Sequence, residues 1–288
     1  MRIVNSHVHM VELTEDLKHN GPSIPEGISV YKNIRQSIDL LSVETLLSQM
    51  DEAGIEKSVL FAVDAPILYS SNDYVSTLCR QHPYRFLGFA SLNPKDTNAA
   101  ATLEHAINDL GLKGLKFHPP LQDFYPNDET VYPIYEKATQ LDIPVVFHVG
   151  TTPFGNRCKL SQANPLLIDD VANNFPDLRI MLTHLGTLWH NESFMVVEKH
   201  PNVFIDTAAY LYEIPRLLDI NLIKRLGTNK VIFGTDYPSP FVDEPHCMKK
   251  FVDCITSLGF SQDLLEDIFF NNFNCFLNNI KRSDTKGA

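Results

Sequence analysis

Two histidines near the start of the chain, His7 and His9 in the segment VNSHVH, are separated by a single residue. Side chains of a β-strand alternate between its two faces, so residues two apart point the same way. The pair would therefore present two imidazoles to one point. Alone, this pattern is weak evidence of function, because the chain contains 11 histidines and such pairs also arise without a shared role.

Three further ionisable side chains stand at the ends of short apolar segments: His148 after VVF, His184 after MLT and Asp236 after FGT. In a parallel barrel, the carboxyl ends of the strands meet on one face, where active sites are assembled. Neutral imidazoles and a carboxylate suit Zn²⁺ and related divalent transition metals. Ionisable groups at the ends of apolar strands are costly unless they are paired or bound to metal. We therefore predict one metal-centred site from this trio and the histidine pair.

The elements that would position these side chains follow a regular alternation of short apolar segments and segments of helical periodicity. The expected strands are residues 2–7, 57–63, 85–92, 114–118, 144–150, 179–186, 202–209 and 230–238. The expected helices are residues 43–54, 72–81, 99–110, 129–141, 165–175, 193–199, 215–226, 244–257 and 262–278. Parallel strands need crossover helices and are buried on both faces. The alternation therefore predicts an α/β fold, a (β/α)₈ TIM barrel.

The domain prediction is one barrel over residues 1–280, with a long loop at about 11–42 after the first strand and a disordered tail at 281–288. The loop has little periodicity and is predicted to be a lid over the site. An open, doubly wound sheet is the alternative fold. The turn after the first strand, however, carries HVHM instead of a glycine-rich dinucleotide motif, which favours the barrel.

Composition narrows the range of partners and compartments. The formal net charge is -11 and no dense cluster of Lys and Arg occurs, so nucleic acids and anionic membranes are not expected partners. A small anionic substrate remains compatible, because a local cation in a pocket can act against the global charge. The 5 cysteines are dispersed and odd in number, which indicates reduced thiols. Without a signal-peptide pattern or a long apolar run, we expect a cytoplasmic protein that binds a small molecule. Barrels of this type often pair, so a homodimer is compatible with the sequence, but no sequence feature decides the oligomeric state.

The same segments resemble the amidohydrolase superfamily, and specifically its amidohydrolase-2 branch of TIM-barrel metal-dependent hydrolases. This branch includes enzymes similar to aminocarboxymuconate-semialdehyde decarboxylase and resorcylate decarboxylase. The motifs that carry the resemblance are VNSHVH, GLKFHP, IPVVFHVG, LTHLG, NVFIDTAA and VIFGTDYP, in that order between residues 4 and 238. They are specific for the superfamily and much less so for one reaction.

The resemblance implies a metal-binding role for His7, His9, His148 and Asp236, and a catalytic role for His184. It implies a divalent metal, zinc first and manganese second, with one ion favoured and two left open. Such a metal activates water and polarises a carbonyl, while Asp236 would also be catalytic as the acceptor of the water proton. His184 would stabilise the oxyanion or act as acid and base.

One position departs from the pattern of the branch, whose members commonly carry an aspartate two residues before the first histidine. This chain has Asn5 there. A neutral amide can still orient a metal ligand by hydrogen bonding, so we expect tuning of the site and not loss of function.

Three residues are predicted to bind substrate: Lys116, His118 and Arg157. Lys116 and His118 share one face of their strand, and an ammonium near the metal suits a carboxylate-bearing substrate. The alternative for Lys116 is an ion pair inside the barrel. The resemblance adds another, because binuclear members of the superfamily carry a carboxylated, metal-bridging lysine on this strand. The alternative for His118 is a packing role or the orientation of a neighbouring metal ligand. The alternative for Arg157 is a solvated position on the surface.

Asp206, at the end of the seventh expected strand, is expected to hydrogen-bond the pocket or to cap a helix. It is left outside the predicted catalytic, metal-binding and substrate-binding sets.

The leading functional interpretation is hydrolysis of a C–O or C–N bond in a small carboxylated lactone, ester or amide through metal-activated water. The alternative is non-oxidative decarboxylation of an aromatic or muconate-type acid, which the same ligands would support. The hydrolase is preferred because the chain is shorter than many decarboxylases of the branch, which is an argument by association. A barrel that binds without catalysis is the third interpretation, but it predicts broken ligand positions, and all five are intact.

Overall fold

The computed structural model describes residues 1–12, 42–66, 68–152, 154, 156, 158–208, 210–238 and 247–280. Within them, parallel strands form a three-stranded and a five-stranded sheet. The first sheet contains β1 (Val4–His9), β2 (Lys57–Phe61) and β5 (Phe86–Phe89), in that order. The second contains, in spatial order, β10 (Val231–Ile232), β9 (Val203–Asp206), β8 (Ile180–Leu182), β7 (Val145–Phe147) and β6 (Leu115–Phe117).

Two seams join these sheets into a closed barrel. At one seam, a parallel bridge pairs Ala90, just after β5, with Leu115 of β6, and the N–H of Lys116 donates to the carbonyl of Ala90 at 2.7 Å. At the other, a parallel bridge pairs Val8 of β1 with Tyr237, beyond β10. The eight strands thus run in chain order around the barrel, which confirms the predicted fold.

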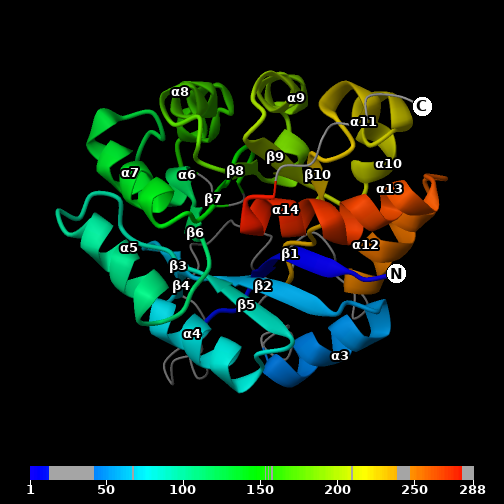
Figure 1. Cartoon of the computed structure of the whole chain (residues 1–288), viewed down its shortest axis with the longest axis horizontal. Coiled ribbons are helices and arrows are strands. Elements are labelled where there is room, and N and C mark those ends of the chain that lie inside the picture. The colour runs from blue at the N-terminus through cyan, green and yellow to red at the C-terminus, as the bar shows by residue number, and fades with distance from the viewer. Residues whose placement is uncertain are drawn as a thin grey trace.

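Helices surround this barrel on the outside (Figure 1). They are α3 (Val43–Ala53), α4 (Asn72–Gln81), α5 (Ala99–Asn108), α7 (Tyr132–Gln140), α8 (Leu166–Asn174), α9 (His190–Lys199), α10 (Ile214–Leu217), α11 (Ile220–Leu226) and α12 (Cys247–Thr256). The side chains of Ser42 and Ser71 accept from backbone N–H groups in the first turns of α3 and α4, which satisfies donors that a helix leaves free. Gly54 ends α3 with φ of 67°, a left-handed conformation that favours glycine.

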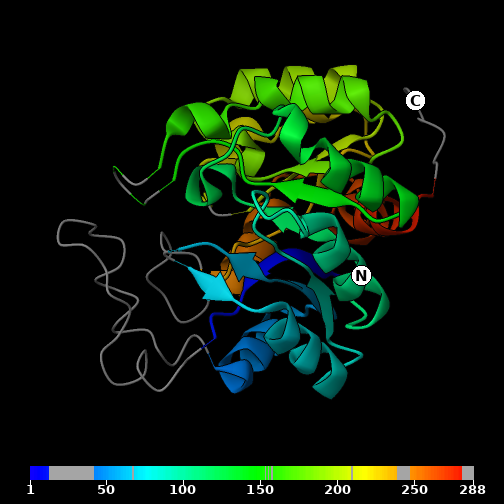
Figure 2. The same ribbon diagram turned by 90° about the vertical axis from the view of Figure 1, so that its left-hand side faces the viewer.

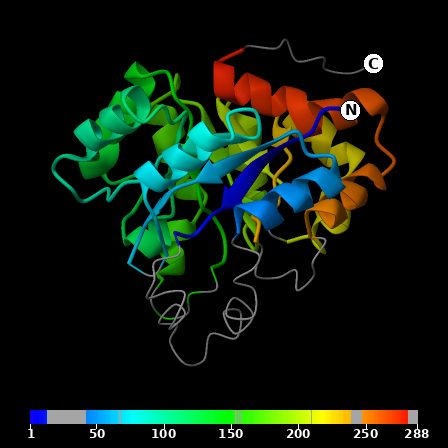
Figure 3. The same cartoon turned by 90° about the horizontal axis from the view of Figure 1, so that it is seen from below.

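The barrel interior is filled by one apolar cluster. It includes Val4, Val59, Phe61, Phe89, Val146, Met181, Phe204 and Ile232 from the strands, together with Phe273 and Phe276. The last two belong to α14 (Asn272–Asn278), which crosses the end of the barrel where the strands begin (Figures 1 and 3). We call this the closed end. The carboxyl ends of the strands lie at the opposite end, which we call the site end.

Several elements differ from those expected. The helix expected at 215–226 is divided into α10 and α11, because Asp219 accepts from the N–H of Leu222 at 2.8 Å and begins a new helix. The helix expected at 262–278 is α13 (Gln262–Glu266), a π-helical turn η7 (Asp267–Asn271) and α14. The sequence did not predict the antiparallel pair β3 (Val63–Asp64) and β4 (Tyr69–Ser70), or the short helix α6 (Pro119–Gln122).

Short 3-10 turns complete the described part: η3 (Glu129–Val131), η5 (Leu160–Ala163) and η6 (His184–Gly186). Figure 2 shows β3 and β4, which follow the carboxyl end of β2 and so lie at the site end. Most of the predicted lid, residues 13–41, and the predicted tail, residues 281–288, lie outside the described residues. Among the described helices, none has the length and apolarity needed to cross a membrane.

Candidate metal centre and active site

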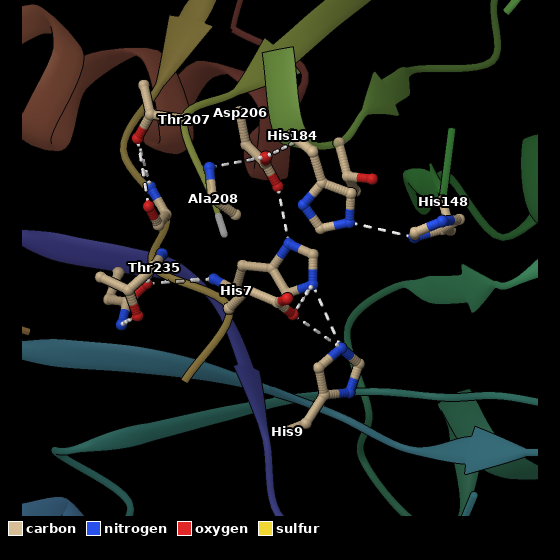
Figure 4. Close-up of polar contacts among 12 residues, drawn as sticks. His7, His9, His148, His184, Asp206, Thr207, Ala208 and Thr235 are labelled. Atoms are coloured by element: carbon tan, nitrogen blue, oxygen red, sulfur yellow. Dashed lines mark hydrogen bonds and ion pairs between the residues drawn. The ribbon is translucent and has the colours of Figure 1, made fainter. Parts of the chain in front are cut away.

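Three of the predicted ligands converge at the site end. β1 continues to His9, two residues further than expected, so both of its histidines belong to the strand and point to the same side (Figure 4). Their Nε2 atoms are 3.1 Å apart. Asp236 follows β10, and its Oδ1 lies 3.0 Å from Nε2 of His7 and 3.3 Å from Nε2 of His9. The structure therefore brings His7, His9 and Asp236 together.

The spacing of these three atoms fits a divalent metal. With metal–ligand bonds of about 2.0–2.2 Å, neighbouring ligand atoms of a tetrahedral or octahedral site lie roughly 2.8–3.6 Å apart. The observed separations of 3.0, 3.1 and 3.3 Å fall in this range. The group consists of two imidazoles and one carboxylate and is largely buried. These donors suit zinc or manganese, and the ionised Asp236 brings into this largely buried group a negative charge that a cation would balance.

His148 and His184 form a second pair beside this group. Nε2 of His184 lies 3.0 Å from Nδ1 of His148, and Nε2 of His148 lies 3.1 Å from the carbonyl oxygen of Thr151. A carbonyl only accepts, so Nε2 of a neutral His148 carries the proton and its Nδ1 accepts from His184. Nδ1 of His184 is then left buried without a hydrogen-bond partner among the described atoms. In this structure His148 thus contacts His184 and stands apart from the three converging ligands.

Burial and nearby charge set the protonation of these groups. Burial, reinforced by Lys116, holds the pKa of His148 well below its usual range. Burial does the same for His184, against the opposing effect of Asp236. Burial alone would raise the pKa of Asp236, but His7 and His9 outweigh it and hold that pKa well below its usual range. Near neutral pH the site therefore contains an ionised Asp236 and a neutral His148–His184 pair.

His184 occupies an unusual backbone conformation. Its φ is 64° and that of Leu185 is 48°, both in the left-handed region that L residues seldom adopt. Gly186 follows with φ of 72°, and a Cβ there would lie 1.9 Å from Oγ of Ser193. The turn thus requires a glycine and contains two strained residues, which persist only where surrounding contacts hold them.

Asp206, at the end of β9, supplies such contacts. Its Oδ1 accepts from the N–H of His184 at 2.7 Å and from the N–H of Ala208 at 3.0 Å. Its Oδ2 lies 2.8 Å from Nδ1 of His7. Sequence reasoning gave Asp206 a pocket hydrogen bond or a helix cap as alternatives, and the structure supports the first. The signal that could have placed it in the site is its position at a strand's carboxyl end, the criterion that selected Asp236.

The predicted substrate contacts have different surroundings. Nζ of Lys116 is buried, has no hydrogen-bond partner among the described atoms, and lies 5.0 Å from the ring centre of Phe61. Burial lowers the pKa of Lys116 to about 8, although Asp206 and Asp236 oppose the shift. His118 stacks on His148 with ring centres 3.8 Å apart and an interplanar angle of 9°. Arg157 lies outside the described residues.

Comparison with known proteins places this geometry in context. The family described as Amidohydrolase matches residues 4–272. A γ-resorcylate decarboxylase from Polaromonas sp. is 24% identical over 253 residues, which cover 67% of this chain and 76% of the relative. A 2-keto-4-carboxy-3-hexenedioate hydratase from Sphingobium sp. is 27% identical over 61% of this chain and 59% of the relative.

Solved structures show the same fold. An uncharacterised TIM-barrel protein from Bordetella bronchiseptica aligns with a TM-score of 0.77 and 22% identity, covering 96% of this chain and 98% of the other. A 5-carboxyvanillate decarboxylase from Novosphingobium aromaticivorans, complexed with manganese and 4-hydroxy-3-methoxy-5-nitrobenzoic acid, aligns with a TM-score of 0.71 and 17% identity. That alignment covers 96% of both chains.

Proposed function

The chain belongs to the Amidohydrolase family, and from that premise we propose that it is a metal-dependent, non-oxidative decarboxylase of a phenolic aromatic acid. The observation that carries the proposal is the convergence of His7, His9 and Asp236 at separations suited to a divalent metal. The decarboxylases among its relatives support this reaction over the hydrolysis preferred from sequence. The chain's length, which favoured hydrolysis, is the weaker argument, since the match covers 76% of the γ-resorcylate decarboxylase.

We propose that one metal, zinc or manganese, is held by His7, His9 and Asp236, with His148 as the fourth protein ligand. The manganese-bound neighbour supports the choice of metals. His148 would have to exchange its contact with His184 for the metal. If elemental analysis finds two metals per chain, we propose that the second is bound by His148 and His184.

When bound, the metal supplies a Lewis acid that holds and polarises the carboxylate and phenolic oxygens of the acid. The chain's own residues must then manage one proton, because the overall reaction is ArCOO⁻ + H⁺ → ArH + CO₂. We propose that Asp236 and His184 carry this proton. Asp236 is ionised and its side chain is 17% exposed, so it can receive a proton at the open side of the site. His184 is neutral and has an unshared Nδ1 lone pair.

Substrate binding is proposed to depend on Lys116, His118 and Arg157. Lys116 places a cation in the wall of the site without an ion-pair partner among the described residues, so its field is available to a substrate carboxylate. His118 accepts from the N–H of Leu121 at 3.3 Å through Nδ1. Its Nε2 then carries the proton and is a donor for a substrate oxygen.

Hydrolysis of a lactone, ester or amide is the second candidate function. The family description supports it, and the hydratase relative gives a case of water addition within the family. The same ligands would serve this reaction, with Asp236 accepting the proton of water.

Metal analysis and an activity screen test the proposal. The purified protein is analysed for bound divalent metals, reconstituted with Zn²⁺ or Mn²⁺, and incubated with a panel of hydroxybenzoic acids and carboxylated lactones. Release of CO₂ and ring opening are measured side by side. We expect CO₂ from at least one phenolic acid. Ring opening without CO₂ would favour hydrolysis, and a protein without affinity for either metal would refute both functions.

A further inference from the structure

The contacts of Asp206 assign it a role beyond the ligand set, and we propose that it is the positioning residue that prepares His7 for the metal. This inference rests on the metal centre of the proposed function. Asp206 is completely buried and meets three donors: the ring of His7 and the backbone N–H groups of His184 and Ala208. Figure 4 shows it between the His7 ring and these backbone groups.

The first part of the role concerns the proton of His7. A carboxylate only accepts hydrogen bonds, so Asp206 Oδ2, 2.8 Å away, keeps the proton of a neutral His7 on Nδ1. Nε2 of His7 is then a lone pair directed at Nε2 of His9 and Oδ1 of Asp236. Without Asp206, the proton could equally reside on Nε2, where it would occupy the position of the metal. Carboxylates that orient ligand histidines in this way raise metal affinity.

The second part concerns His184. Oδ1 of Asp206 accepts from its N–H at 2.7 Å, within the left-handed turn formed by His184 and Leu185. One carboxylate thus fixes the ring of a proposed ligand from β1 and the backbone of a proposed proton carrier beyond β8. A single buried carboxylate therefore positions both a proposed metal ligand, His7, and a proposed proton carrier, His184.

His7, His184 and Asp206 also lie close enough to form a ligand group by themselves. Their hydrogen bonds argue against a metal there. Oδ2 of Asp206 contacts Nδ1 of His7, and Oδ1 is occupied by two N–H donors. A metal would have to displace these contacts, so a hydrogen-bonded scaffold explains this trio.

The substitution Asp206→Asn separates this role from simple packing, because the two side chains have nearly the same shape. The asparagine oxygen is expected to keep its hydrogen bonds from the two backbone N–H groups. If the amide turned, its NH₂ group would face two other donors and make no hydrogen bond to them. The NH₂ group then faces His7 and donates to Nδ1. That reverses the tautomer and places a proton on Nε2.

A matched control exists elsewhere in the chain. Nε2 of His200 lies 2.6 Å from Oδ1 of Asp169, an equivalent carboxylate–histidine pair between α8 and the end of α9. Neither residue belongs to the proposed metal centre. Asp169→Asn therefore breaks the same type of contact without changing the ligands.

The experiment measures Zn²⁺ affinity by competition with a chromophoric chelator in the full-length wild type and both variants. Metal-free protein labelled with ¹⁵N-histidine is also studied by two-bond ¹H–¹⁵N correlation, with His7→Gln used for assignment. We expect Asp206→Asn to bind Zn²⁺ about 10- to 100-fold more weakly and to move the His7 proton from Nδ1 to Nε2. Asp169→Asn should bind as the wild type does, and all three should show circular dichroism of a folded barrel.

The outcomes separate this inference from the proposed function. If the wild type binds Zn²⁺ and Asp206→Asn binds it within twofold, or if His7 of the wild type is protonated on Nε2, the inference is wrong and the metal centre stands. If affinity is lost equally in both variants, a general effect on folding replaces the positioning role. If the wild type binds no Zn²⁺, the metal centre fails, while the tautomer measurement still decides whether Asp206 fixes His7.

Discussion

Two buried lysines at opposite ends of the barrel have contrasting surroundings. At the closed end, Nζ of Lys230 donates to the carbonyls of His200, Pro201 and Val203 at 2.9, 2.8 and 3.0 Å. At the site end, Nζ of Lys116 has no hydrogen-bond partner among the described atoms. A buried ammonium without partners is unfavourable, so its retention indicates a use other than stability.

The same contrast extends to other polar groups. At the closed end, Nη1 and Nη2 of Arg179 donate to the side chain and the carbonyl of Asp142 at 2.5 and 2.6 Å, while its Nε has no partner among the described atoms. At the site end, Nδ1 of His9 and Nδ1 of His184 are buried without partners among the described atoms. The cationic groups at the closed end are therefore bound by protein oxygens, whereas at the site end a buried ammonium and two imidazole nitrogens have no partner among the described atoms and are available to a ligand. The following predictions test this division.

The largest effect is expected from Asp236→Asn, which removes the charge of a proposed ligand and proton carrier. Turnover should fall by about 1,000-fold or more, since proton transfer alone commonly contributes 10²–10⁴. Asp142→Asn at the closed end is the matched control and should keep near wild-type turnover. Steady-state CO₂ release on the best substrate measures both. Persistent activity in Asp236→Asn would show that its carboxylate is not part of the reaction.

Methionine substitutions of the two lysines should change the free energy of unfolding in opposite directions. Lys230→Met strands three carbonyl acceptors and should lower it by about 3 kcal/mol. Lys116→Met removes an unpartnered buried cation and should raise it by about 2 kcal/mol while reducing turnover. Urea unfolding of the metal-free proteins measures both values. Equal destabilisation by the two substitutions would remove the distinction between the ends.

The fold and the location of the site follow from sequence because they depend on periodicity. Apolar segments alternating with helices predict a barrel, and residue types at strand ends predicted the convergence of His7, His9 and Asp236. Periodicity gives the face on which a side chain lies, but not the rotation of its ring. It therefore missed the contact of His148 with His184 and Thr151.

The specific contacts of Asp206 and the turn at His184 could not be predicted from sequence for a related reason. Hydrogen bonds such as that from the His184 N–H to Asp206 join residues 22 positions apart and depend on a left-handed backbone. No local propensity predicts this conformation in a histidine followed by a leucine, because tertiary contacts hold it.

The pH dependence of stability provides a finer test of Lys116. Burial lowers its pKa from 10.5 to about 8 in the folded protein. Between these values the unfolded chain binds a proton that the folded protein has released, so the free energy of unfolding rises with pH. From pH 8 to 10 the increase should be about 2 kcal/mol in the metal-free wild type relative to Lys116→Met. If the free energies of unfolding of the two proteins change with pH in parallel, Lys116 does not have the lowered pKa that its burial predicts.

The smallest effect is expected at Asn5, where the branch commonly carries an aspartate. Nδ2 of Asn5 donates to Oγ1 of Thr235 at 2.8 Å, and its Oδ1 accepts from the N–H of Thr235 at 3.1 Å. These bonds join β1 to the segment that contains Asp236. In Asn5→Asp the carboxylate can still accept from the N–H, and the Thr235 hydroxyl can turn to donate to it.

Asn5→Asp should therefore change Zn²⁺ affinity by less than tenfold, because no polar group loses its partner, while the buried carboxylate lowers the free energy of unfolding. Asn5→Leu strands the N–H of Thr235 and should cost about 3 kcal/mol, with a larger loss of Zn²⁺ affinity. Urea unfolding and chelator competition measure the two quantities on both variants. If Asn5→Asp behaves like Asn5→Leu, the amide itself is required, and the difference from the branch reflects a site adapted to a neutral side chain. If it behaves as expected, the hydrogen bonds across this seam, and not the charge at position 5, keep His7 and Asp236 in register.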